Sequence, residues 1–539
     1  METTLSLLQD YDQHFLQVQI AEQHASQTQA EPIEPPTVAF YRWDNREFSQ
    51  QALPDKLAVL AQFQPQSFAM QMWQQLQWLL AGDPSASHDL IWQQYQQLNF
   101  IQKNMWYSQL MRASFTGSVI DLDRRPFYES LIDSYCQQAQ RVCQIQPLQD
   151  EGNQQLAIII TNQFLTSLHG PTLTTLNYAS CLQQMGMQVV VICTGTVARN
   201  YQMYYPMPAP AFFGNVTDEY YQADIQINLD SRQRNIAPGQ GASVQCWGEK
   251  FSFIQLDTNE NPAHLHELAE FINQANPRYI FCVGGLNPAA EWIGQARPVL
   301  AIPCVTSLQL PKYMVPVVLR ELSEADTQHI ARLQLPHPVF CSQLPFRLRP
   351  NTAIKTSVPS DQKTLFAICG YRLEEEFTTA FFTTMRRIKQ TIPNAYFVLI
   401  GASKYSSYPA DLLQCTEFTG RVLNAIDIIG QCHFLLNPRR QGGGTSAVEA
   451  LSLGIPVLTD SYGDTYQYVG DDFAFDSDED RLLFIQSYLR STELQQEYHE
   501  KCLGRAAMVT DTRHIFQPLL LDYDSYLYEL QQTDHLAVA

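Results

Sequence analysis

The segment CHFLLNPRRQGGGTSAVEALSLGIPVLTD, residues 432–460, carries the strongest evidence for the fold that we predict for this chain. A short apolar run ends at Asn437-Pro438, three glycines follow, and a second apolar run lies beyond Gly454. Two such runs, separated by a glycine turn and a helix-forming segment, are typical of a strand, a helix and a second strand in succession. The segment therefore predicts a βαβ unit with a glycine-rich turn before its helix.

This glycine-rich turn has the chemistry of a phosphate site. The triplet 442–444 lacks Cβ atoms, so a ligand can come close to its backbone. A helix that begins behind the triplet, capped by Thr445 or Ser446, offers unpaired N–H groups and the positive end of its dipole to an anion. Glu449 lies one turn into that helix, where a carboxylate can accept hydrogen bonds from the two hydroxyls of a ribose. Phosphate and ribose together indicate a nucleotide.

Strand, triplet, helix, Glu449 and the run Gly-Ile-Pro-Val (454–457), taken in this order, resemble the donor-binding signature of GT-B glycosyltransferases, in particular the family 4-like donor domain. In that signature two carboxylates flank the glycine-rich turn, and the resemblance implies that Glu449 is the second. Gln441 stands in place of the first, and as a neutral partner it can still hold hydroxyls of the transferred sugar. An ordinary αβ crossover with a flexible turn is the alternative.

The resemblance also implies a nucleotide sugar as co-substrate, which we expect to be a UDP-sugar, and no other cofactor. The predicted nucleotide-binding residues are Gly170, Gln441, Gly442, Gly443, Gly444, Thr445, Ser446 and Glu449. Gly170 precedes Pro171 at the start of a predicted helix, and it gives the donor close access to the backbone.

Arg372 is the predicted diphosphate cation. It follows the apolar run 364–369 and a glycine, and in the resembling enzymes an arginine there meets the diphosphate, often with a lysine a few residues later. Here three glutamates, 374–376, stand where that lysine would follow, so Lys404 and the pair Arg439-Arg440 are weaker candidates for the second cation. A solvated arginine that pairs with those glutamates is the alternative for Arg372.

His169 is the second predicted catalytic residue. It precedes Gly170 in the loop after the first strand of the first α/β half, so it faces the glycine-rich turn if the two halves meet across a cleft. A histidine there can act as base toward an acceptor hydroxyl or polarise the departing sugar. The alternative is a histidine that caps or packs the loop. Gly284-Gly285 after another predicted strand either lines the acceptor side or forms a turn.

The rest of the chain predicts the architecture. Residues 1–145 show apolar residues at three- and four-residue spacing, typical of helices. Residues 154–345 and 363–515 alternate strand-like and helical segments, with an irregular Tyr- and Pro-rich insertion at 201–240, and residues 516–539 form a closing helix. We therefore predict an α/β chain of the GT-B class, with two Rossmann-like domains facing a cleft and preceded by an all-helical N-terminal domain.

Charge and composition bear on the class of binding partner and on the cellular location. The net charge of −20 argues against nucleic acid and against an anionic membrane surface. The N-terminal residues lack the pattern of a signal peptide, and no apolar run is long enough for a transmembrane helix, so we expect a cytoplasmic protein. Twelve cysteines without a Cys-x-x-Cys pair indicate neither a disulfide framework nor a zinc site.

Three Asp-x-Asp triplets bear on metal dependence, because metal-dependent glycosyltransferases of the other major fold use such a triplet. They are Asp121-Leu122-Asp123, Asp476-Ser477-Asp478 and Asp522-Tyr523-Asp524. None follows a buried strand of a nucleotide-binding half, so we interpret them as solvated turns and expect no metal site. The helix dipole and Arg372 then take the place of a metal ion.

The sequence thus predicts a metal-independent glycosyltransferase, specifically a hexosyltransferase, that moves a sugar from a nucleotide diphosphate to a protein or saccharide acceptor. A lipid-linked acceptor and either stereochemical outcome stay open. The helical front domain resembles that of enzymes of protein glycosylation, and it is a possible site for a partner protein. A catalytically silent GT-B protein that serves as an assembly or secretion partner is the main alternative, and a nucleotide-sugar epimerase is a third.

Overall fold

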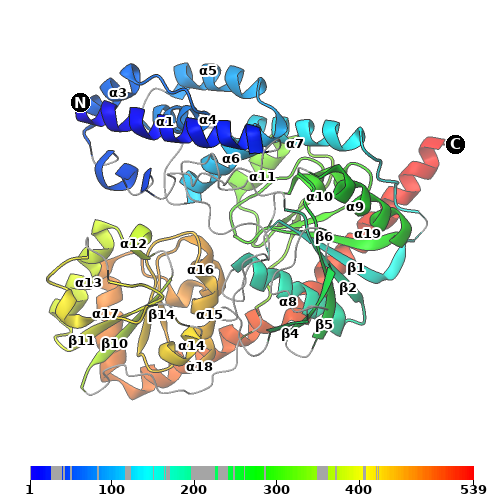
Figure 1. Ribbon diagram of the computed structural model, residues 1–539. Helices are drawn as coiled ribbons and strands as arrows, with labels where there is room; N and C mark the ends of the chain where they lie inside the picture. Colours follow the sequence, from blue (N-terminus) through cyan, green and yellow to red (C-terminus); the bar gives the residue numbers. More distant parts are fainter. Residues whose placement is uncertain are drawn as a thin grey trace.

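The computed structural model of the protein describes residues 2–25, 39–40, 43–48, 51–81, 84–115, 123–149, 151–162, 164, 170–195, 225–228, 239, 241–246, 249–259, 261–284, 287–346, 348, 362–370, 373–404, 408–420, 422 and 424–538. Figure 1 shows a layer of N-terminal helices above two α/β bodies. In these ranges no helix combines the length and the apolar character that a membrane span requires.

The N-terminal layer is helical, as predicted. Its elements are α1 (Glu2–Ala25), the π-helical turn η1 (Asp44–Phe48), α3 (Leu53–Gln62), α4 (Phe68–Ala81), α5 (Pro84–Gln96), α6 (Phe100–Phe115) and α7 (Arg125–Gln140). Aromatic rings fill its interior: the centroids of Phe40 and Phe48 lie 5.5 and 5.0 Å from that of Trp73, and the indole N–H of Trp73 donates to Asp44. Edge-on ring contacts of this kind stabilise the layer without regular sequence repeats.

Helix α7 joins this layer to the first α/β half. The hydroxyl of Tyr128 donates to Glu291 at 2.6 Å, and Glu291 also accepts from the backbone N–H groups of Lys312 and Tyr313 at 2.7 and 2.6 Å. Burial raises the pKa of Glu291, while these hydrogen bonds act in the opposite direction. The helical layer and the first half share one hydrophobic core.

The first half is built on a nine-stranded sheet of order β3-β4-β5-β2-β1-β6-β7-β8-β9. Its strands are β1 (Asn153–Thr161), β2 (Gln188–Cys193), β3 (Ile225–Asn228), β4 (Gly241–Cys246), β5 (Glu249–Gln255), β6 (Pro277–Val283), β7 (Leu300–Ile302), β8 (Val315–Val318) and β9 (Phe340–Cys341). All neighbours pair in parallel except β3-β4 and β4-β5. Chain order reverses between β1 and β6.

Helices cover both faces of this sheet, as the alternation of apolar residues along β1 requires. Ile158 and Ile160 belong to the core shared with the N-terminal layer, whereas Ala157 and Ile159 belong to the opposite core. The helices of this half are α8 (Gly170–Gln184), α9 (Pro262–Ala275), α10 (Pro288–Gly294) and α11 (Glu324–Arg332). Helix α8 lies in the second core, and α9 and α10 lie in the first.

The prediction of an irregular insertion at 201–240 is wrong at residues 225–228, which form a strand. Strand β3 lies within that range and pairs antiparallel with β4, which pairs with β5. Most of the insertion lies outside the described residues. The sequence of β4, GASVQC, is short and rich in small and polar residues, so it lacks the apolar run that predicts a buried strand.

The second half has a five-stranded parallel sheet of order β12-β11-β10-β13-β14. Its strands are β10 (Thr364–Cys369), β11 (Ala395–Ile400), β12 (Thr416–Phe418), β13 (Phe434–Leu436) and β14 (Val457–Leu458). Its helices are α12 (Leu373–Glu376), α13 (Thr379–Thr391), α14 (Ala425–Ile429), α15 (Gly444–Ser452), α16 (Gly463–Val469), α17 (Asp478–Arg490) and α18 (Thr492–Thr510). From β10 the chain builds the sheet to one side through β11 and β12, and then to the other side through β13 and β14. The position between β10 and β13 is therefore the switch point of this sheet. Ligands of open α/β sheets bind outside the carboxyl ends of the strands at a switch point.

The C-terminal helix α19 (Thr512–Val538) returns to the first half. In Figure 1 it runs in red obliquely across the first half to the C label, and its apolar residues share a core with β1 and β2. Asp524 accepts from Arg278 and Tyr279 of β6 at 2.8 and 3.0 Å, and the hydroxyl of Tyr523 donates to the carbonyl of Pro298 at 2.8 Å. The helix begins at Thr512, a few residues before the predicted position 516.

Candidate functional site

The glycine-rich segment forms the predicted βαβ unit. Strands β13 and β14 pair in parallel, and α15 lies between them in sequence. Helix α15 begins at Gly444, with Gly443 at the N-cap position and a φ of 101°. The prediction that Thr445 or Ser446 caps this helix is therefore wrong, because both lie inside its first turn; Thr445 is exposed and the Ser446 hydroxyl donates to the carbonyl of Gly443 at 3.1 Å.

The start of α15 has the property on which the predicted phosphate site depends, which is a set of backbone N–H groups without acceptors in the helix. The first N–H groups of a helix have no acceptor within the helix, and Gly443 has no side chain that could cap them. A φ of 101° is rarely adopted by residues other than glycine, so Gly443 is required by the backbone. The positive end of the helix therefore lies beside the carboxyl end of β13, next to the point at which chain order reverses.

Arg440 fills the space between the ends of β10 and β13. Its guanidinium donates to the carbonyl of Cys369 at 2.8 Å, to Asn437 Oδ1 at 3.0 Å and to Glu376 Oε2 at 2.7 Å. Its side chain is 8% exposed. A Cβ on Gly443 would lie 2.6 Å from the guanidinium nitrogens. Sequence patterns indicated only a minor role for this arginine, whereas it lies at the centre of the site.

Gly444 allows the rings of Tyr468 and Phe346 to pack against the helix start. A Cβ at this position would lie 2.6 Å from Tyr468 Cδ2 and 3.4 Å from Phe346 Cζ. The rings of Phe346 and Tyr468 meet edge to face with centroids 4.7 Å apart. Two members of the triplet, Gly443 and Gly444, are thus explained by neighbouring side chains and backbone conformation.

Gln441 is held by a carboxylate that no sequence pattern indicated. Its Nε2 donates to Asp464 Oδ1 at 3.2 Å, and the same oxygen accepts from the backbone N–H and the hydroxyl of Thr306 at 2.8 and 2.7 Å. Asp464 lies in the first turn of α16, and Thr306 follows β7, so these bonds join the two halves. Burial raises the pKa of Asp464, and the hydrogen bonds and the charge of Arg440 offset part of that effect.

Glu449 lies in the second turn of α15 and is 4% exposed. The hydroxyl of Ser452 donates to its backbone carbonyl at 2.7 Å. Its role toward a ribose stays a prediction. Glu449 is therefore a buried residue of the helix whose start lies beside the carboxyl ends of β10 and β13.

The two predicted catalytic residues, His169 and Arg372, lie outside the described residues, as does Gly285. Gly170 is the first residue of α8 and is exposed, and a Cβ added there would meet no described atom within 4 Å. Arg372 falls between Gly370 and α12, close in sequence to Cys369 and Glu376, both of which bind Arg440. Lys404 is exposed beyond the end of β11.

The carboxyl edge of the first sheet is lined differently. Thr194, directly after β2, is fully buried, and its hydroxyl accepts from Asn287 Nδ2 at 2.9 Å. The hydroxyl of Thr258 donates to the carbonyl of Thr194 at 3.0 Å. Gly284, after β6, has a φ of 110°, and a Cβ there would meet Asn162 Oδ1 at 3.4 Å. Hydroxyl and amide groups therefore meet at this switch point.

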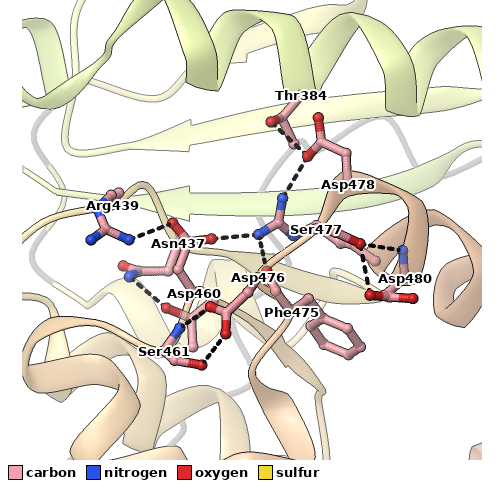
Figure 2. A network of polar contacts seen from close by, with 12 residues as sticks. Thr384, Asn437, Arg439, Asp460, Ser461, Phe475, Asp476, Ser477, Asp478 and Asp480 are labelled. Atoms are coloured by element: carbon pink, nitrogen blue, oxygen red, sulfur yellow. Dashed lines mark hydrogen bonds and ion pairs between the residues drawn. The ribbon is translucent and has the colours of Figure 1, made fainter.

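The Asp-x-Asp triplets with described aspartates take part in structural contacts. Figure 2 shows Asp476 accepting from Ser461, and Asp478 from Thr384. Asp478 also accepts from Arg481 at 2.8 Å, and Asp524 binds β6 as described above. Asp121 lies outside the described residues. In the part of the chain that the structure describes, no group of His, Cys, Asp and Glu residues is arranged to hold a metal ion.

The two halves, their parallel sheets and the closing helix are the GT-B fold, the fold of a large class of glycosyltransferases. An O-GlcNAc transferase from Thermobaculum terrenum aligns with 98% of this chain and 99% of its own, at a TM-score of 0.52 and 11% identity. At this identity the likeness establishes the fold, and it includes the N-terminal helical layer.

Two further solved structures align with a smaller part of the chain. TarM from S. aureus aligns with 68% of it and 99% of its own chain, at a TM-score of 0.42 and 11% identity. HepE from Anabaena, in complex with UDP and glucose, aligns with 68% and 99%, at a TM-score of 0.41 and 11% identity. No family model and no curated protein matches the sequence.

Proposed function

We propose that the protein is a glycosyltransferase that moves a sugar from a UDP-sugar to an acceptor. The observation that carries this proposal is the switch point of the second sheet, where an uncapped helix start after Gly443 lies beside the Arg440 guanidinium and the carboxyl ends of β10 and β13. A diphosphate fits this chemistry, because backbone N–H groups and a helix dipole bind anions without a metal. The fold supports the proposal by analogy only.

Each candidate residue then has a distinct task. The start of α15 holds the diphosphate, Glu449 accepts from the ribose hydroxyls, and the side-chain oxygen of Gln441, whose amide nitrogen is bound to Asp464, accepts from a sugar hydroxyl. Arg372 neutralises the negative charge that grows on the leaving phosphate. His169, from the first half, acts as base toward the acceptor or polarises the departing sugar.

The finer features belong to the same proposal. We infer hexosyl transfer without a metal, to a protein or saccharide acceptor, with the N-terminal helical layer as a candidate surface for an acceptor or partner protein. The domain limits at 145, at 154–345 and at 363 stay predictions, and the closing segment predicted at 516–539 begins with α19 at Thr512. The eleven cysteines described as free are consistent with the reducing conditions of the cytoplasm.

One observation favours a second candidate, a catalytically silent GT-B protein that acts in assembly or secretion. Gln441 replaces a carboxylate, and its amide nitrogen is already bound to Asp464. The charge of Arg440 is likewise paired with Glu376. Such a protein binds the nucleotide but does not transfer the sugar.

Nucleotide binding and turnover together test the proposal. UDP at one hundred times its dissociation constant should stabilise the protein by about 2.7 kcal/mol, both with and without EDTA. Turnover is then measured as UDP release from UDP-glucose and UDP-N-acetylglucosamine. Binding with turnover supports the enzyme, and binding without turnover on any acceptor supports the silent alternative. No stabilisation by UDP contradicts both, and loss of stabilisation and turnover in EDTA contradicts metal independence.

A further inference from the structure

Arg440 holds together four segments that meet at the second switch point. Its three nitrogens donate to the end of β10 through the carbonyl of Cys369, to the end of β13 through Asn437, and to α12 through Glu376. The fourth segment is the turn at Gly443, which leaves room for the guanidinium only because it has no Cβ. The ion pair with Glu376 is nearly buried, with side chains 8% and 12% exposed.

The contacts of Arg440 lie on both sides of the segment that carries the predicted cation. Cys369 is the last residue of β10 and Glu376 is the last residue of α12, so a single guanidinium contacts both elements. A Cβ on Gly370 would lie 2.7 Å from Arg440 Nη1, which shows how close the backbone directly after β10 lies to the guanidinium. Any movement of Arg440 therefore alters its contacts with β10, with α12 and with the backbone before α15.

We infer that Arg440 is a positioning residue for the donor site, one that sets the relation between the helix start at Gly443, the end of β10 and α12. This inference rests on the proposed function. Glu376 balances the positive charge of Arg440, so Arg440 acts through geometry, and the charge that meets the diphosphate comes from Arg372 and the helix start.

Only an arginine meets the demands of this position. The three acceptors lie in different directions around a planar group, which matches the fixed fork of a guanidinium. A lysine carries the same charge on a single nitrogen, and its ammonium cannot satisfy the Cys369 carbonyl, Asn437 and Glu376 in the same geometry. Arg440→Lys therefore removes the fork and keeps the charge, which separates positioning from charge.

The experiment uses the full chain and three variants. Arg440→Lys and Glu376→Gln alter the ion pair, and Arg386→Lys is the matched control, because Arg386 makes a forked pair with Asp411 on the surface of α13. Hydrogen exchange of the backbone amides at 364–377 is measured without nucleotide. The dissociation constant for UDP is measured by calorimetry. Far-UV circular dichroism checks that each variant is folded.

The expected result is at least tenfold faster exchange at 370–377 and at least tenfold weaker UDP binding in Arg440→Lys. Glu376→Gln keeps an acceptor oxygen, so it should fall between wild type and Arg440→Lys, by about threefold in both measurements. Arg386→Lys should stay within twofold of wild type. If Arg440→Lys does not fold, Glu376→Gln decides alone.

An increase in UDP affinity in Glu376→Gln would overturn the inference. If Arg440 binds phosphate directly and Glu376 masks its charge, Glu376→Gln should bind UDP more tightly than wild type, and Arg440→Lys should keep most of the affinity. Wild-type exchange rates in Arg440→Lys also overturn positioning. If wild type does not bind UDP, the proposed function fails, and the exchange rates still decide whether Arg440 holds the end of β10 and α12 together.

Discussion

The two sheets reverse chain order at equivalent points, between β1 and β6 in the first and between β10 and β13 in the second, yet different chemistry lies at each. The carboxyl ends of the strands at these points are called the first edge and the second edge below. At the first edge, around Thr194, hydroxyl and amide groups bind one another. At the second edge, the Arg440–Glu376 ion pair lies beside an uncapped helix start. The topology is shared and the side chains are not.

Under the proposed function, the unlike chemistry of the two edges favours the second edge for the donor. A nucleotide diphosphate carries negative charge, which the helix start of the second edge can balance. The hydroxyl and amide groups of the first edge are neutral and bind one another, so they offer no such positive site. The protein's charge of −20 gives no long-range attraction to an anionic donor, so the local positive site has to provide it. Fold alone would not distinguish the two edges.

Substitution of Arg372 should have the most severe consequence, and it tests whether the second edge stabilises developing charge. Negative charge grows on the β-phosphate as the glycosidic bond breaks, so an interaction with it strengthens in the transition state. Arg372→Ala should lower turnover by about 100-fold or more, with a smaller loss of UDP affinity, as measured by steady-state kinetics and calorimetry. Near wild-type turnover at saturating donor would contradict the role and make Lys404 the next cation to test.

Substitution of Glu449 tests whether the second edge also binds the ribose. Its burial changes the choice of variant, because Glu449→Ala would leave a cavity in α15, whereas Glu449→Gln keeps the volume. Glu449→Gln should weaken UDP binding by about 1 to 3 kcal/mol, the usual value of hydrogen bonds to a charged group, and change Tm little. UDP and 2′-deoxy-UDP, measured with both proteins, provide the control, since equal affinity throughout would remove Glu449 from the site.

A pair of glycines allows the two edges to be tested by the same substitution. Gly284 and Gly443 follow corresponding strands of the two sheets and have φ values of 110° and 101°. Either alanine variant should lose about 1 to 3 kcal/mol of stability in urea unfolding, because both positions disfavour a Cβ. Only Gly443→Ala also displaces Arg440, so only that variant should bind UDP at least tenfold more weakly. An equal loss of UDP affinity in Gly284→Ala would mean that the edges do not differ as described.

Much of this fold could be predicted from sequence because its parallel strands are buried. Runs such as those of β1 and β10 are apolar along most of their length, and a strand buried on both faces needs that composition. Strand β4 escaped detection because its residues are small and polar. The helical layer was recognised from its apolar spacing, whereas its shared core with the first half depends on contacts such as Tyr128 with Glu291 that no local pattern records.

The candidate site was predictable only in its backbone part. The glycine triplet, the helix and Glu449 lie within one segment, so their order in sequence is also their order in space. Asp464 was missed, and Arg440 was predicted only as a weaker candidate cation, because their partners are distant: Arg440 binds Cys369 and Glu376, and Asp464 binds Thr306. The predicted cap at Thr445 or Ser446 was wrong because the left-handed conformation of Gly443 starts the helix earlier than the side chains suggest.

A weaker effect is expected at Asp464, the carboxylate that connects the two halves. Because its pKa is raised above its ordinary value of 3.8, the native protein holds this proton more tightly than the unfolded chain does. Stability should therefore fall as the pH rises from about 4 through the native pKa. Asp464→Asn keeps an acceptor oxygen for Thr306 but does not titrate, so its stability should exceed that of wild type near pH 7 by less than about 1 kcal/mol.

Unfolding in urea from pH 4 to 7 measures this difference. It should shrink as the pH falls, since wild type then protonates Asp464 and comes to resemble the variant. Asp476→Asn is the control with the opposite sign: hydrogen bonds from Ser461 lower the pKa of Asp476, so its contribution to stability is lost as the pH falls. A difference between Asp464→Asn and wild type that does not change with pH would mean that this carboxylate is solvated, and that the two halves separate in solution at the contact between Asp464 and Thr306.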